Sequence, residues 1–286
     1  MTLVGKWGMS ICVFCLFLGA TSFVSLYTHN EFDPSIFTVN DEDPLNILGV
    51  FGANLSSLLL VILSLSCNKE TEITITKVSG SPEYVNAKLS LEEPIITDDG
   101  YEFSFNVNQY QLGLQTLKDF EYGLANSSKG QHIHLIVNND PYSAHYTEKF
   151  SKKLEADTNV ILAFLSRSYH ESVKNKNAFI LTQLGEQKID LNNEFLFYSR
   201  PKGTYKGSDT EKLLLDFYLI NTEISADGNK VRATIQDKEF IIDEWAPYYI
   251  EGLAKGEVKI KLELIDSSGN LIDTPFNPSE RTVTLE

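Results

Sequence analysis

Hydrophobic and polar residues alternate along most of the chain beyond residue 72. Successive side chains of a β-strand point to opposite faces, so a period of two predicts strands with one row in a core and the other in solvent. Turn sequences rich in Asp, Ser, Asn and Gly separate these stretches. The clearest alternating rows are Ile73 and Ile75; Tyr101, Phe103, Phe105 and Val107; and Leu213, Leu215, Phe217 and Leu219.

Many short strands at this spacing predict β-sandwiches. Helical periodicity is confined to Phe150–Glu155 and Asp209–Leu213. The predicted fold is therefore an all-β body of two tandem, immunoglobulin-like β-sandwich domains, preceded by two transmembrane-type helices.

The body also repeats an order of features, once in residues 101–181 and again in residues 213–285. YEFSFNV corresponds to LLLDFYL, HIHLIVNNDPY to KVRATIQDKEF, SAHY to WAPY, and VILAF to VKIKL. This order predicts two copies of one unit, with domains at 68–189 and 190–286 after a membrane segment at 1–67.

The membrane segment is predicted from two uncharged runs of 21 residues, Trp7–Tyr27 and Ile47–Cys67. Each is about as long as a helix needs to be to cross a hydrocarbon core of roughly 30 Å. Helices are therefore expected at about 7–27 and 47–66, with a polar, acidic loop between them.

Residues 7–62, with the motifs DPSIF and GVFGANL, resemble the N-terminal membrane domain of FtsK-type DNA translocases. The resemblance implies two membrane crossings. The motor activity of that family is not expected here, because the chain has no G-x-x-x-x-G-K-[ST] sequence to hold the phosphates of ATP.

Residues 47–286 resemble a Bacteroidetes-type lipoprotein. LLLVILSLSCNKETE looks like a lipoprotein signal followed by a charged tether, which implies lipidation of Cys67. GQHIHLIVNNDPYSAHY resembles bacterial periplasmic β-domains with a Gly-x-His-x-His strand. The β domains are then expected in the periplasm or on the cell surface.

These two resemblances conflict, because two crossings from the cytoplasm return residue 67 to the cytoplasm, whereas lipidation requires Cys67 on the outer side. One hypothesis is that an FtsK-like start and a lipoprotein body are joined near residue 60. An uninterrupted reading frame in independent isolates would argue against such a fusion or assembly artefact.

The chain carries a formal net charge of −15, and 23 basic against 34 acidic residues lie in 68–286. This balance disfavours nucleic acid as a partner of the β domains, since phosphate binding needs a basic face. The three cysteines, Cys12, Cys15 and Cys67, all precede the body, which therefore has neither disulfides nor thiolate metal ligands.

Four of the five histidines fall in the first copy of the repeat: His132, His134, His145 and His170. The second copy has Lys230, Arg232 and Pro247 at the first three corresponding places, so the fold does not require histidine there. Alternation along this strand sends Ile133, Leu135 and Val137 to one face and His132 and His134 to the other. Residues two apart on one strand face are separated by roughly 6.5–7 Å, a distance that lets His132 and His134 bind one ion. An all-nitrogen set suits Zn²⁺ or Cu²⁺.

The alternative is that these histidines are structural groups bonded to neighbouring strands and loops. A hydrolase is disfavoured because no G-x-S-x-G sequence occurs. We therefore expect a membrane-anchored, lipoprotein-like, non-enzymatic binding or accessory protein for a metal ion or a peptide. The alternative function is a membrane fragment of an FtsK-like translocase without its motor.

Overall fold

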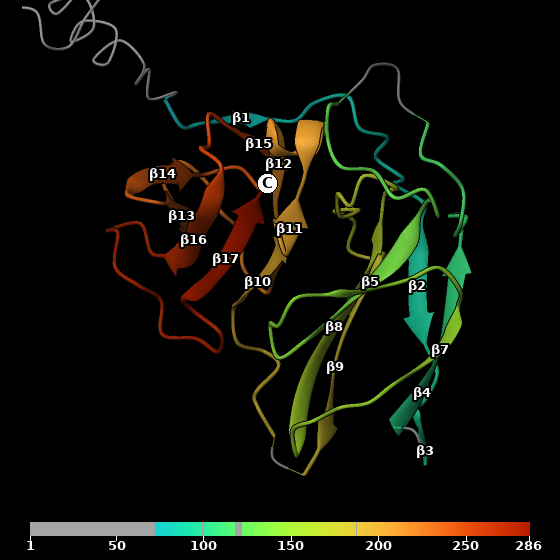
Figure 1. Ribbon diagram of the computed structural model, residues 1–286. Helices are drawn as coiled ribbons and strands as arrows, with labels where there is room; N and C mark the ends of the chain where they lie inside the picture. The colour runs from blue at the N-terminus through green and yellow to red at the C-terminus, as the bar shows by residue number, and fades with distance from the viewer. Residues whose placement is uncertain (1–71, 99, 118–121, 187) are drawn as a thin grey trace, which may run out of the picture. The chain divides into compact units, whose positions relative to one another are not determined.

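The computed structural model describes residues 72–98, 100–117, 122–186 and 188–286 (Figure 1). The chain divides into two compact units, Met1–Glu70 and Thr71–Glu286. The two helices predicted at about 7–27 and 47–66, together with Cys67, lie outside the described residues. Among those that are described, none belongs to a helix long and apolar enough to span a bilayer.

The described part is built from short strands, as the alternation predicts, and one 3₁₀ turn. The elements are β1 (Thr74–Lys77), β2 (Lys88–Leu91), β3 (Ile95–Thr97), β4 (Gly100–Asn108), β5 (His132–Val137), β6 (Ser143–His145), β7 (Lys149–Lys152), β8 (Thr158–Ser166), β9 (Phe179–Gly185), β10 (Phe195–Arg200), β11 (Thr204–Tyr205), η1 (Gly207–Thr210), β12 (Lys212–Ile220), β13 (Lys230–Ile235), β14 (Lys238–Ile242), β15 (Tyr248–Glu251), β16 (Gly256–Ile265) and β17 (Ser279–Leu285).

Neither of the two stretches with helical periodicity, Phe150–Glu155 and Asp209–Leu213, forms an α-helix. Phe150 starts inside strand β7, and the second stretch divides between the 3₁₀ turn η1 and strand β12. The strand residues of both segments pair with neighbouring strands, those of β7 with β4 and Lys212 and Leu213 with β15, and this pairing satisfies their backbone groups.

The first sandwich consists of two sheets packed face to face. In one sheet β4 pairs with β2, β3 and β7, and the other has the strand order β6-β5-β8-β9. Its core contains inward side chains of both sheets, among them Leu89, Phe103, Phe105, Ile133, Leu135, Ile161 and Leu165. The predicted inward row of β5 is therefore confirmed for Ile133 and Leu135.

In the second sandwich, the sheet β1-β15-β12-β10 packs against the sheet β11-β17-β16-β13-β14. Its core includes Leu213, Leu215, Phe217 and Leu219, the row that the alternation places inside. Strand β1 pairs with β15 although it lies in the predicted first domain of 68–189. The N-terminal strand of the body thus belongs to the second sandwich.

The strand pairing confirms the internal repeat. In both halves the first strand pairs with the second, the third pairs with the fourth and the sixth, and the seventh pairs with the sixth. Strands β2, β4, β5, β6, β7, β8 and β9 correspond in this order to β10, β12, β13, β14, β15, β16 and β17. One correspondence is wrong: SAHY lies in and after β6, whose counterpart is β14, whereas WAPY follows β14 and ends on the first residue of β15.

The expectation of one solvent-facing row is wrong for the strands where the sandwiches meet. Strands β5, β8, β10 and β12 are buried on both faces. Their outward rows form a third apolar cluster, in which Phe164 stacks on Tyr218 with ring centroids 4.8 Å apart. In a single sandwich this outward face would be exposed to solvent, but here a sheet of the other sandwich packs on it.

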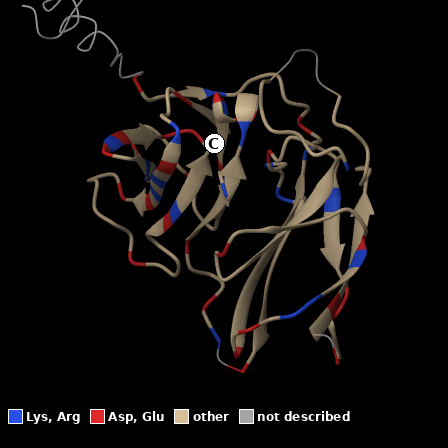
Figure 2. Ribbon diagram, in the orientation of Figure 1, with Lys and Arg blue, Asp and Glu red and all other residues tan. Residues whose placement is uncertain are grey.

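The corresponding outward face of the second sandwich stays polar. Strands β13 and β16 carry charged side chains there, visible as mixed red and blue in Figure 2. Arg232 Nε donates to Glu263 Oε2 at 2.8 Å across the two strands. The outward face of this sheet is exposed in the second sandwich, whereas the corresponding face of the first sandwich is covered. His132 and His134 lie on the covered face.

Candidate metal centre

The centre begins with strand β5, which places His132 and His134 on the outward face of its sheet. Neighbouring strand β8 pairs Ser166 with His132 and Phe164 with His134. Both imidazoles are fully buried. The strand alternation predicts this shared face, and the structure confirms it.

The third histidine comes from the turn after β8. His170 has a positive φ of 69°, a left-handed conformation that is uncommon for residues other than glycine and that often marks functional positions. Its backbone N–H donates to Arg167 O at 2.9 Å, which closes the turn and directs the ring toward β5.

Three ring nitrogens converge. His132 Nε2 lies 2.8 Å from His134 Nε2 and 3.1 Å from His170 Nδ1. Each histidine offers one ligand atom, and all three atoms lie within 4.8 Å of one another. The cluster of His132, His134 and His170 can therefore hold one metal ion.

The hydrogen bond on the far side of His132 orients its ring. His132 Nδ1 donates to Gly130 O at 2.8 Å, so its Nε2 keeps a lone pair directed into the cluster. A metal-ligating imidazole usually has such a carbonyl acceptor on its other nitrogen. His134 Nδ1 has no hydrogen-bond partner in the described structure, so the ring of His132 is held more firmly than that of His134.

The three imidazoles are neutral at pH 7. Burial lowers the pKa of His132 to about 4, and the cations Arg200 and Lys202 add to this effect. Burial also lowers the pKa of His134 and of His170. Neutral imidazole is the form that binds a metal ion, so few protons would compete with the ion near neutral pH.

Tyr142, from the loop between β5 and β6, covers the cluster. Its ring stacks on His134 with centroids 3.5 Å apart, and its hydroxyl lies 3.2 Å from His170 Nδ1. Two cations lie by the same tyrosine ring: Lys202 Nζ is 4.0 Å and Arg200 Cζ is 5.4 Å from its centroid. Alternation on one strand cannot reveal these contacts, because Arg200 and Lys202 belong to the second sandwich.

The structure does not bring the fourth predicted ligand to this cluster. His145 pairs with Ile133 across the β5–β6 hairpin, on the inward face of the sheet. It stacks on Phe150 with centroids 3.4 Å apart, and its Nε2 lies 2.8 Å from Ser143 Oγ. The equivalent pairing in the second copy joins Val231 to Ile242, so Ile242 and not Pro247 corresponds to His145.

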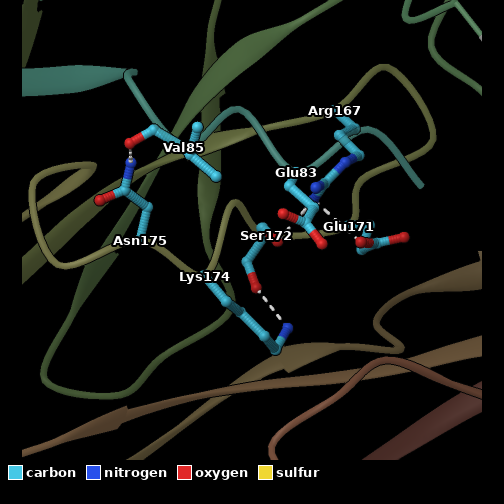
Figure 3. A pocket seen from close by; sticks show the side chains of 7 residues that line it. All are labelled: Glu83, Val85, Arg167, Glu171, Ser172, Lys174 and Asn175. Atoms are coloured by element: carbon cyan, nitrogen blue, oxygen red, sulfur yellow. Dashed lines mark hydrogen bonds and ion pairs between the residues drawn. The ribbon is translucent and has the colours of Figure 1, made fainter. Parts of the chain in front are cut away.

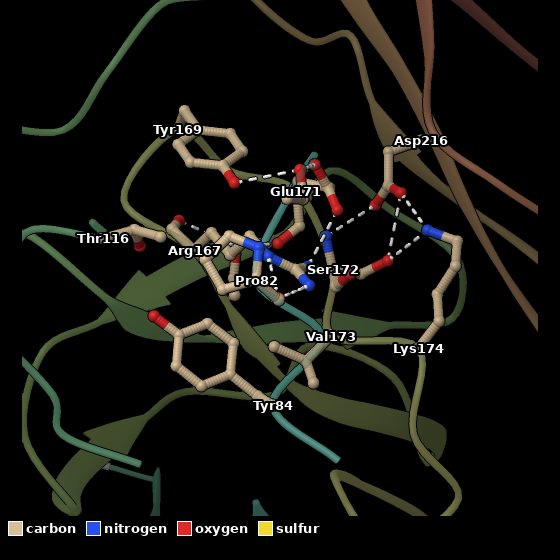
Figure 4. A network of polar contacts seen from close by, with 12 residues as sticks. Pro82, Tyr84, Thr116, Arg167, Tyr169, Glu171, Ser172, Val173, Lys174 and Asp216 are labelled. Atoms are coloured by element: carbon tan, nitrogen blue, oxygen red, sulfur yellow. Dashed lines mark hydrogen bonds and ion pairs between the residues drawn. The ribbon is translucent and has the colours of Figure 1, made fainter. Parts of the chain in front are cut away.

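A second buried polar group lies in the connection between β8 and β9 (Figure 4). Arg167 Nη1 donates to Glu171 Oε1 at 2.9 Å, and Ser81 Oγ donates to Glu171 Oε2 at 2.5 Å. Burial raises the pKa of the Glu171 carboxyl, and the charge of Arg167 opposes that rise.

This group continues into the second sandwich through Asp216 of β12. Its carboxylate accepts hydrogen bonds from Ser172 Oγ at 3.0 Å and from Lys174 Nζ at 2.5 Å. A cavity of about 380 Å³ adjoins the group (Figure 3), lined by Glu83, Val85, Arg167, Glu171, Ser172, Lys174 and Asn175. The buried charges of this group already form ion pairs with one another, Arg167 with Glu171 and Lys174 with Asp216. We therefore interpret the group as a structural link between strands.

Comparison with known proteins bears mainly on the N-terminal segment. Residues 9–67 match the family model described as the 4TM region of the DNA translocases FtsK and SpoIIIE. The match covers about a fifth of the chain and indicates membrane association of that segment. No curated protein matches the chain.

Several solved structures resemble parts of the chain at low similarity. The fibronectin(III)-like modules of Clostridium thermocellum CbhA are 12% identical, with 32% of this chain and 97% of that chain covered and a TM-score of 0.26. The central fibronectin-III array of RIM-binding protein is 10% identical over 73% and 72%, with a TM-score of 0.23. The tandem V-type regions of VCBP3, a chitin-binding protein, are 7% identical over 75% and 99%, with a TM-score of 0.21. At these scores the resemblances add nothing to the architecture that strand pairing defines.

Proposed function

We propose that the chain is a membrane-anchored, non-enzymatic binding or accessory protein whose first sandwich holds a Zn²⁺ or Cu²⁺ ion through His132, His134 and His170. The single observation that carries the proposal is the convergence of three ring nitrogens within 4.8 Å at a buried site. The membrane region matched by residues 9–67 supports the anchor.

The spacing of the nitrogens is close to what an ion requires. In a tetrahedral site with metal–nitrogen distances of about 2.0–2.1 Å, two ligand nitrogens stand about 3.3 Å apart. The two nitrogen pairs of His132 are 2.8 and 3.1 Å apart, so each needs to open by only a few tenths of an ångström. The third pair, between His134 and His170, lies within 4.8 Å and would have to reach the same spacing when the ion binds. Since His170 is half-buried, whereas the other two rings are fully enclosed, its side is the route by which the ion enters.

The nearby cations set the expected strength of binding. Arg200 and Lys202 lower the pKa values of these histidines, and the same positive field opposes a divalent ion. Measurable but moderate affinity is therefore expected.

Isothermal titration of the full chain in detergent micelles with Zn²⁺ and with Cu²⁺ tests the proposal. His170→Gln should weaken binding at least about tenfold, which corresponds to a loss of about 1.4 kcal/mol of binding free energy. His145→Gln is the matched control, because His145 faces the sandwich core, and it should bind as the wild type does. Absence of specific heat from the wild-type chain contradicts the proposal.

The anchor has its own test. We propose that Cys67 is lipidated and that the β domains lie in the periplasm or on the cell surface, where they can also meet a peptide or protein ligand. Palmitate labelling that disappears in Cys67→Ala supports this arrangement. Two stable spans with a cytoplasmic C-terminus support instead an FtsK-like membrane fragment without its motor.

A further inference from the structure

Arg200 is a buried guanidinium without an ionic partner. The residue is 7% exposed, and among the described residues no carboxylate forms an ion pair with it. Its Nη1 donates to Tyr205 Oη at 2.7 Å, but its Nε has no hydrogen-bond partner. The hydroxyls of Tyr205 and Tyr142 interact with this guanidinium, but neither carries a negative charge that would offset it. A buried cation without an ionic partner is destabilising, so an anion beside Arg200 would be favourable.

Other cations surround the same place. Lys202 Nζ donates to Tyr142 O at 2.7 Å and has two further protons to offer. Burial lowers the pKa of Lys202 to about 8, and repulsion from Arg200, Arg281 and Lys152 contributes to the shift. The carboxylate of Asp140 acts on Arg281, whereas neither Arg200 nor Lys202 has a carboxylate partner among the described residues.

The positive field extends to the histidine cluster. Tyr142 links the two, because its ring lies by Arg200 and Lys202 while its hydroxyl lies 3.2 Å from His170 Nδ1. Arg200 and Lys202 both help to lower the pKa of His170. A metal ion at the cluster would therefore have cations, not carboxylates, beside its remaining coordination position.

Three imidazoles leave one place open on a tetrahedral ion. We propose that a small oxyanion, a carboxylate or a phosphate, occupies this place together with the metal ion and takes its counter-charge from Arg200 and Lys202. This inference rests on the proposed metal site. It explains why the groups next to a candidate cation site are themselves cationic, since the anion offsets both the metal and the guanidinium.

The inference predicts effects of opposite sign for one substitution. Lys202→Gln removes a positive charge that opposes the metal ion, so metal binding in the absence of an anion should be tighter. The same substitution should weaken the anion's binding to the metal-loaded chain about tenfold, because its counter-charge is lost. A residue with a purely structural role would weaken both.

The experiment uses Co²⁺ as a spectroscopic probe, since its visible absorption reports the ligands of the ion. The full chain in detergent micelles, in a buffer that does not coordinate metals, is first titrated with Co²⁺. Inorganic phosphate and acetate are then added in separate titrations. Lys202→Gln is compared with the matched control Lys176→Gln, which removes an exposed lysine elsewhere.

The expected result is a saturable spectral change with at least one anion, weakened in Lys202→Gln and unchanged in Lys176→Gln. A Co²⁺ spectrum that neither anion alters overturns this inference and leaves the metal site standing. An equal response of both lysine variants overturns it as well. Failure of the wild-type chain to take up Co²⁺ overturns the metal site and the inference together.

Discussion

The ion pair between Asp216 and Lys174 offers a quantitative test of how the two sandwiches are joined. Asp216 lies on β12 of the second sandwich, and Lys174 follows β8 of the first. Their side chains are 0% and 14% exposed, and Lys174 Nζ lies 2.5 Å from Asp216 Oδ1. Asp216→Asn removes the charge but keeps the size of the side chain.

The cost follows from burial. Removing one member of a buried ion pair leaves the other charged and unpaired, which typically costs about 3–5 kcal/mol. Asp216 Oδ1 also accepts from Ser172 Oγ at 3.0 Å, and an asparagine oxygen can keep that bond. The lower end of the range, a loss of about 3 kcal/mol in the free energy of unfolding, is therefore expected for Asp216→Asn.

Urea denaturation followed by the fluorescence of Trp245 measures this loss, because Trp245 packs edge-on against Tyr218 where the sandwiches meet. The matched control is Glu155→Gln, which breaks the ion pair between Glu155 and Lys153. The side chains of this pair are 81% and 75% exposed. An exposed pair of this kind is worth about 1 kcal/mol or less. If Asp216→Asn costs no more than Glu155→Gln, the buried pair does not stabilise the contact and our reasoning is wrong.

Three further predictions concern the loop and the histidines. Asn139→Ala should cost about 1–3 kcal/mol in urea denaturation, because Tyr198 N–H loses its buried acceptor Asn139 Oδ1 at 2.8 Å, whereas exposed Asn192→Ala should cost far less. Without metal, the free energy of unfolding should fall as the pH drops from 6.5 toward 4. In this range the unfolded chain takes up a proton at His132, whereas the folded chain, in which the pKa of His132 is about 4, does not. His132→Gln should flatten that part of the profile. Zn²⁺ affinity should change little between pH 7 and pH 6, where Lys202, with a pKa of about 8, is already charged and the histidines stay neutral. An affinity that drops steeply below pH 7 would contradict the neutral histidines.

The strands and the repeat could be predicted because they depend on local patterning. The row Leu213, Leu215, Phe217 and Leu219 has its predicted place in the second core, and so has Ile133 with Leu135 in the first. Alternation along a strand fixes which side chains share a face, and therefore placed His132 with His134. It cannot say what covers that face, because the covering strands β10 and β12 are more than 50 residues away.

The error at His145 has a simple geometric cause. Asn138 and Asn139 both have positive φ and form the tight β5–β6 turn, which sets the register that pairs His145 with Ile133. Proximity in sequence suggested that His145 would join the cluster, whereas register sends it to the inward face. The contribution of Arg200 and Lys202 could not be predicted at all, since it arises from contact between two domains.

The metal site itself is tested most directly by X-ray absorption at the zinc edge of the Zn²⁺-loaded chain. Our account predicts imidazole nitrogens at about 2.0–2.1 Å, three in the wild type and two in His170→Gln. His145→Gln should leave the spectrum as it is in the wild type. A shell of oxygen ligands without imidazole scattering, or the same spectrum from His170→Gln as from the wild type, would contradict the assignment of His132, His134 and His170 as the ligands.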